Sequence, residues 1–176
     1  MKIKYITLPL IMAAMIATSC NNGPKTPSHD EMLNAIDSIE ASINVEFPET
    51  IDTAISNDLI SKYVQFADAY PNDSLTPGFL LQAARWAYAT NDVDGMIKYY
   101  DRIIDNYDDF EKLDECMYEK GINLDNAGRK EEARKAYQEF IDEFPDHFLT
   151  DDITKAMKLL DMSDEQLNAF LNQQNK

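Results

Sequence analysis

The amino-acid sequence predicts an all-α protein in which antiparallel helix pairs stack as a short α-solenoid with capping helices. The first observation is a sequence repeat with a spacing of 37 residues. The pattern of residues 63–71 recurs at 100–108 and again at 137–145. The second is an apolar stripe at helical spacing in each copy. Repeats with a period between about 20 and 50 residues indicate stacked units, since one unit cannot bury its apolar face alone.

The N-terminal part of this stack is the least regular. Residues 30–44 predict a helix whose isoleucines lie on one face, and residues 45–53, which include Pro48, predict a loop. Residues 56–70 carry the pattern of the second helix of a pair. We therefore expect an atypical first pair ahead of the regular repeats.

Two regular helix pairs follow. The first is predicted over residues 77–90 and 92–107, with a turn at Asn91, and the second over residues 111–126 and 129–144, with a turn at Gly128. Their apolar stripes are Leu80, Ala83, Ala84, Ala87; Met96, Ile97, Tyr100, Ile103, Ile104, Tyr107; Met117, Gly121, Leu124; and Ala133, Ala136, Tyr137, Phe140, Phe144.

The C-terminal segment predicts two more helices. Thr150 is expected to cap a short helix that ends at Leu160. Ser163 and Gln166 have the spacing of a capping box and predict a last helix that reaches about residue 173. We expect these terminal helices to act as caps of the stack.

The second regular pair resembles the tetratricopeptide repeat, a helix-turn-helix unit of 34 residues. The small, large and aromatic residues of that family match Gly121, Leu124, Gly128, Ala133, Tyr137 and Pro145. The pair before it matches more loosely, and the resemblance extends over residues 56 to about 160. It implies a TPR-like α-solenoid that binds a protein or peptide segment in a concave groove.

By this resemblance, six residues line the groove: Leu81, Arg85, Tyr88, Tyr118, Ile122 and Asp125. The family's clamp for acidic C-termini needs a lysine and an asparagine where this chain has other residues, so such a clamp is not expected. The set predicts an apolar and aromatic strip with two polar residues, suited to a helix or an extended peptide. The alternative is that the terminal helices fill the groove.

The first residues predict a targeting segment. Lys2 and Lys4 precede an apolar stretch, residues 5–17, that is too short to span a bilayer as a helix, and small residues lead to Cys20. This pattern resembles a bacterial lipoprotein signal, which implies cleavage after residue 19 and acylation of Cys20. We expect a signal peptide over 1–19, a disordered tether over 20–29 and a helical domain over 30–176, anchored in the outer membrane and facing the periplasm.

The charge balance constrains the partner. The chain has 16 basic and 32 acidic residues, a formal net charge of −16. Removal of residues 1–19 takes away Lys2 and Lys4 and no acidic residue, so the net charge becomes −18. Nucleic acid is not an expected partner, because phosphate contacts need cations, and a neutral or basic protein segment fits better.

No catalytic residue, metal site or cofactor is expected from the sequence. His29 and His147 are predicted to be solvated surface histidines, and Cys116 a packing residue. Residues 90–95 resemble a calcium loop only loosely and coincide with the turn at Asn91. Two rivals to a non-enzymatic binding module remain: a metal-dependent or carbohydrate-active protein that uses acidic groove residues, and a structural spacer with a filled groove.

Overall fold

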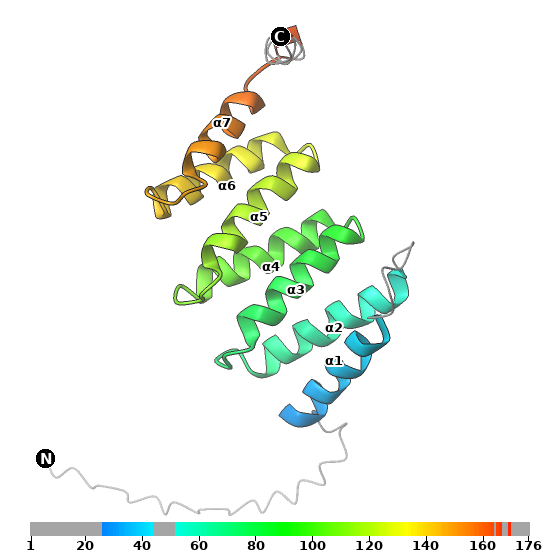
Figure 1. The fold of residues 1–176 in the computed structure, drawn as a ribbon. Helices are drawn as coiled ribbons and strands as arrows, with labels where there is room; N and C mark the ends of the chain where they lie inside the picture. The colour runs from blue at the N-terminus through cyan, green and yellow to red at the C-terminus, as the bar shows by residue number, and fades with distance from the viewer. Residues whose placement is uncertain (1–25, 44–51, 164, 167–168, 170–176) are drawn as a thin grey trace, which may run out of the picture.

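The computed structural model describes residues 26–43, 52–163, 165–166 and 169 (Figure 1). The predicted signal peptide, Cys20, the first part of the tether and most of the predicted last helix lie outside the described residues. The helices, in chain order, are α1 (His29–Ile43), α2 (Thr53–Ala69), α3 (Thr76–Ala89), α4 (Val93–Asn106), α5 (Leu113–Asn126), α6 (Lys130–Glu143) and α7 (Thr150–Leu160).

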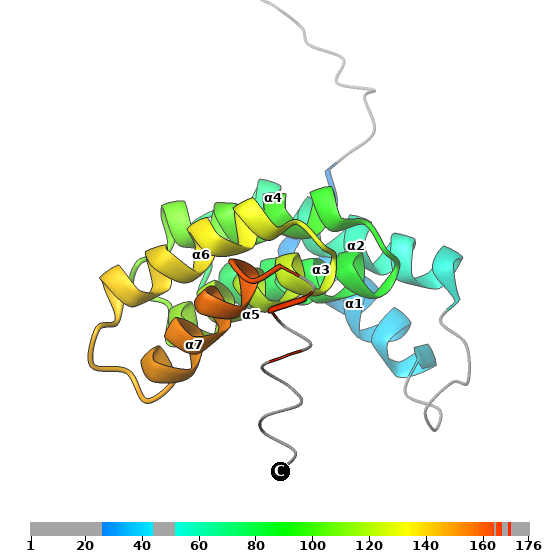
Figure 2. The same ribbon diagram turned by 90° about the horizontal axis from the view of Figure 1, so that it is seen from above.

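The helices form a stack of antiparallel pairs in two layers. Each helix packs on its neighbours in the chain, and the stack rises from α1 to α7 (Figure 1). Figure 2 shows α1, α3, α5 and α7 in one layer and α2, α4 and α6 in the other. The described part of the chain holds no strand, and none of its helices combines the length and apolar character needed to cross a bilayer. The predicted all-α class of stacked helix pairs is confirmed.

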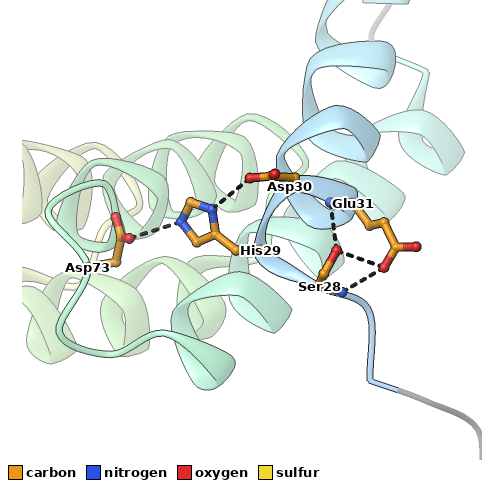
Figure 3. A network of polar contacts seen from close by, with 5 residues as sticks. All are labelled: Ser28, His29, Asp30, Glu31 and Asp73. Atoms are coloured by element: carbon orange, nitrogen blue, oxygen red, sulfur yellow. Dashed lines mark hydrogen bonds and ion pairs between the residues drawn. The ribbon is translucent and has the colours of Figure 1, made fainter.

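Local chemistry sets where the helices begin. Ser28 and Glu31 form a capping box at α1, in which the Ser28 amide donates to Glu31 over 2.7 Å (Figure 3). Asp52 and Asp92 cap α2 and α4 through their carboxylates. The predicted capping role of Thr150 is wrong, since its hydroxyl donates instead to the Phe144 carbonyl at the end of α6.

The two turns inside the regular pairs share one geometry. Asn91 and Gly128 both have a positive φ, 64° and 74°. After each, the next amide reaches back to the carbonyl five residues earlier, from Asp92 to Ala87 and from Arg129 to Leu124. This is a Schellman motif, in which the left-handed residue satisfies the last carbonyls of the helix. Both predicted turns are confirmed.

The apolar core has two parts. The larger runs from α2 to α7 and includes most residues of the predicted stripes of both regular pairs. The smaller lies between α1, α2 and the outer side of α3, around five buried residues: Ile36, Leu59, Tyr63, Phe66 and Ala83. Helix α1 packs on α2 and contributes only to the smaller part.

Candidate functional site

A cleft of about 640 Å³ opens between α1, the middle of α2, α3 and the turn before α5. It lies at the end of the stack where the smaller core is located. Its lining residues are Glu40, Ile43, Leu59, Tyr63, Ser74, Leu75, Gly78, Phe79, Leu81, Gln82, Trp86, Phe110, Glu111 and Lys112. Leu75 stands at the rim with 44% of its surface exposed, a high value for a leucine.

Aromatic rings form one wall of the cleft. Phe79 stacks on Tyr63 with ring centroids 5.3 Å apart, and it meets Phe66 edge to face at 4.9 Å. Trp86 packs against the same cluster. Phe79 thus packs on α2, the helix that precedes its own. Both rings remain partly exposed, and this leaves them free to contact a ligand in the cleft.

The polar groups of the cleft carry net negative charge. The Tyr63 hydroxyl donates to Glu40 over 2.5 Å, and burial, together with this carboxylate, raises the pKa of Tyr63 well above its usual range. Glu111 and Lys112 are exposed at the opposite side. Among the described residues, neither Glu40 nor Glu111 has an ion-pair partner. Two carboxylates and one ammonium group therefore face the cleft.

Gly78 leaves space in the α3 wall. A Cβ atom built on Gly78 meets no heavy atom within 4 Å. Gly121, by contrast, lies against the Tyr137 ring, 2.5 Å from the position of such a Cβ. A side chain at Gly78 would thus project into the cleft without a clash, and this makes the position useful for blocking it.

The equivalent place one repeat later is filled. The Arg85 guanidinium, on α3, donates twice to Glu119 at 2.9 and 2.6 Å and once to Glu115 at 2.5 Å, both on α5. Glu119 also accepts from the buried Tyr100 hydroxyl at 2.7 Å. The hydrogen bond to Glu119 is the main cause that raises the pKa of Arg85 above its usual range. This network closes the junction between α3 and α5.

The six predicted groove residues do not form one open strip. Leu81 is 1% exposed, so only its edge lines the cleft, and Arg85 is committed to α5. Tyr118 packs edge to face on Phe140 at 6.5 Å. Tyr88 also packs on the core, Asp125 accepts from the Tyr137 hydroxyl at 3.4 Å, and Ile122 is half-exposed. As a partner-binding set they remain a prediction.

Sequence reasoning missed the partners of Arg85. Glu115 and Glu119 are one helical turn apart and lie 30 and 34 residues after Arg85. An acidic i,i+4 pair one repeat beyond an arginine is the signal that could have found them. Glu40 had no such signal, because it belongs to the atypical first pair.

The prediction of two solvated histidines holds only in part. The side chains of His29 and His147 are only 36% and 19% exposed. His29 sits edge-on to Tyr70 at 5.0 Å and bonds Asp73 at 3.0 Å (Figure 3). His147 packs on Phe140 and pairs with Asp114 at 3.2 Å. Each histidine therefore packs on two aromatic rings near the end of an outer-layer helix, α2 for His29 and α6 for His147.

Two other sequence features have structural roles. Cys116 is fully buried in the core, where burial raises the pKa of its thiol to about 12, so the expected packing role is confirmed. In residues 90–95, the Asp92 carboxylate accepts from the Gly95 amide at 2.9 Å as the cap of α4. That carboxylate is already used in capping the helix.

Comparison with protein families identifies the repeats. The family model described as tetratricopeptide repeat matches residues 79–109 and 115–147, which correspond to most of α3 with α4 and of α5 with α6. A search of curated proteins found no match. The match supports a tetratricopeptide-repeat protein with a TPR-like solenoid fold. Repeats of this type indicate a scaffold for protein–protein interaction.

Proposed function

Starting from a chain with two tetratricopeptide repeats, we propose that it is a lipid-anchored scaffold that holds a segment of a partner protein in the cleft between α1 and α3. The observation that carries the proposal is the contrast between this cleft and the next junction. Arg85 closes the junction of α3 with α5, whereas the cleft exposes partly buried rings and unpaired carboxylates among the described residues. Such a mixture of apolar anchors and a few polar groups is typical of binding sites.

The N-terminal sequence supports a proposal for the cellular location of the scaffold. Cleavage after residue 19 would leave Cys20 as an acylated first residue, and two or more lipid chains make attachment stable. We place the protein at the outer membrane, facing the periplasm. Its role there is that of an accessory to outer-membrane assembly or to a periplasmic complex.

Photo-crosslinking in native membranes tests the binding role. Benzoylphenylalanine at position 75, on the rim of the cleft, should capture a discrete partner band, and the same probe at Phe148, 81% exposed at the far end, should not capture that band. Gly78→Leu should abolish the capture because its side chain fills the cleft, and Gly78→Ala is the matched control that leaves it open. Equal capture by both variants would show that the partner does not enter the cleft, and absence of a partner band at position 75 would support the structural spacer instead.

Fractionation tests the anchor. Cys20→Ala should release the protein from the membrane fraction into the soluble periplasm, because lipidation needs the cysteine sulfur. A Cys20→Ala protein that stays with the membranes after a high-salt wash would contradict the lipid anchor. That result would leave the binding role of the cleft untouched.

A further inference from the structure

Two tyrosines of the outer layer occupy the same place in successive units. Tyr63 on α2 and Tyr100 on α4 are 37 residues apart, and both are buried with their hydroxyls donated to a glutamate. Tyr63 lies beneath the cleft flanked by α1 and α3, and Tyr100 bonds at the junction of α3 with α5. The glutamate comes from α1 in the first case and from α5 in the second.

The two glutamates differ in what else they bind. Glu119 receives two hydrogen bonds from the Arg85 guanidinium in addition to the bond from Tyr100. Glu40 receives the bond from Tyr63, and no cation of the described residues pairs with it. Helix α1 has neither lysine nor arginine, and of the residues that the structure describes Lys112 is the single cation that lines the cleft. The first junction thus lacks the guanidinium that the second one contains.

We propose that the partner supplies this missing group: an arginine side chain enters the cleft and pairs with Glu40, as Arg85 pairs with Glu119 inside the repeat. The inference rests on the proposed function and adds the chemistry of the partner. A guanidinium suits the site because it can bridge a carboxylate with two parallel hydrogen bonds. Glu111, at the facing side, gives the charge a second partner, as Glu115 does for Arg85.

The walls of the cleft fit the rest of an arginine side chain. Trp86 and Phe79 are partly exposed and present ring surface on which a guanidinium and its aliphatic stem can stack. Ile43 and Leu75 add apolar surface beside them. The partner segment should therefore carry an apolar residue next to its arginine. The net charge of −16 attracts such a basic segment from a distance.

The test uses Trp86, the one tryptophan of the chain, as the reporter. The probe is the peptide acetyl-Leu-Arg-Leu-amide, titrated into the full-length protein while the Trp86 fluorescence is recorded. Two matched peptides carry citrulline, which has the same shape without the charge, or lysine in place of arginine. The arginine peptide should give a saturable change at millimolar concentration. The citrulline peptide should bind about ten-fold more weakly or less, and the lysine peptide should fall between the two.

Variants separate the cleft from the acidic surface. Glu40→Gln should weaken the arginine peptide about ten-fold and leave the citrulline peptide unchanged, because the new amide oxygen can still accept from Tyr63. Asp37→Asn removes the same charge from the exposed side of α1 and should have no effect. Gly78→Leu should abolish binding of both peptides, and Gly78→Ala should not.

The outcomes decide between the two proposals. Equal affinity for the arginine and citrulline peptides would overturn the arginine inference. So would an affinity for the arginine peptide that is the same in Glu40→Gln as in the wild type. Absence of any change at Trp86 with the arginine peptide would overturn it as well. In each case the proposed function survives if crosslinking at position 75 is still lost in Gly78→Leu membranes. If neither the peptide titration nor the crosslinking at position 75 gives the expected result, the cleft is not a binding site.

Discussion

Tyr63, at the junction of α1 with α3, and Tyr100, at the junction of α3 with α5, occupy the same repeat position, yet the first junction is open and the second is closed. In the closed junction, Arg85 joins Glu115, Glu119 and Tyr100 into one network across two helices. In the open one, Tyr63 and Glu40 bond to each other beside a cleft of about 640 Å³. A repeat stack of this kind thus keeps a cleft open where an internal contact between helices is absent.

The largest expected effect compares the two tyrosines. Tyr100→Ala should lower the free energy of unfolding by about 4 kcal/mol, since it leaves a closed cavity in the larger core. Tyr63→Ala should cost only about 2 kcal/mol, because the space it leaves opens onto the cleft and can fill with water. Urea denaturation followed by circular dichroism measures both. Equal losses would mean that the cleft is not open to solvent.

The second effect compares the charged groups. Arg85→Met keeps the aliphatic bulk but leaves Glu115 and Glu119 facing each other without a cation. Because the network is one-third exposed, we expect a loss of about 1–2 kcal/mol, less than for a buried pair. Glu40→Gln should change stability by less than about 0.5 kcal/mol, since it keeps its bond to Tyr63. A larger loss of stability in Glu40→Gln than in Arg85→Met would contradict the description of the α1–α3 junction as open and the α3–α5 junction as closed.

A smaller effect concerns the turns that hold the pairs together. Gly128→Ala should cost about 1 kcal/mol, because a φ of 74° is unfavourable for a residue with a Cβ atom. Asn91→Gly should stay within about 0.5 kcal/mol of the wild type, since asparagine already tolerates the same conformation. Thermal melting of the two variants checks this ranking. A Gly128→Ala protein as stable as the wild type would contradict the Schellman geometry.

The smallest effect is the pH dependence of stability that His29 causes at the start of α1. The hydrogen bond to Asp73 raises the pKa of His29 above 6.5, so the protonated form is favoured by folding. The contribution is complete below the unfolded-state pKa and is lost as pH rises through the folded-state value. The stability difference between wild type and His29→Gln should therefore shrink as the pH rises from about 6 to about 8. A constant difference across that range would contradict the pairing.

The repeat pattern explains how far the sequence could predict the fold. Tyr63, Tyr100 and Tyr137 recur at one spacing, and all three are buried as this pattern predicts. The turns at Asn91 and Gly128 were predictable from local chemistry. The sequence did not predict the contacts between units. Thr150 has the residue type of a helix cap, but its hydroxyl donates to the Phe144 carbonyl instead.

The cleft itself was not predictable from the repeat register. The register assigned Leu81 and Arg85 to an open groove, since it records which side of a helix faces away from its own pair. It does not record that Glu119, 34 residues later, reaches back to Arg85. Nor does it place Glu40, because α1 lacks the repeat pattern and its position against α3 depends on packing. The open and closed junctions are properties of tertiary structure.

Quenching of Trp86 fluorescence by acrylamide tests the open cleft most directly. Trp86 is the only tryptophan and lines the cleft, so its quenching measures access to that space alone. An open cleft should give efficient quenching in the wild type and in Gly78→Ala, and at least about two-fold weaker quenching in Gly78→Leu, whose side chain would cover the indole. A wild-type Trp86 as protected as in Gly78→Leu would show that the cleft is filled, and would contradict the account.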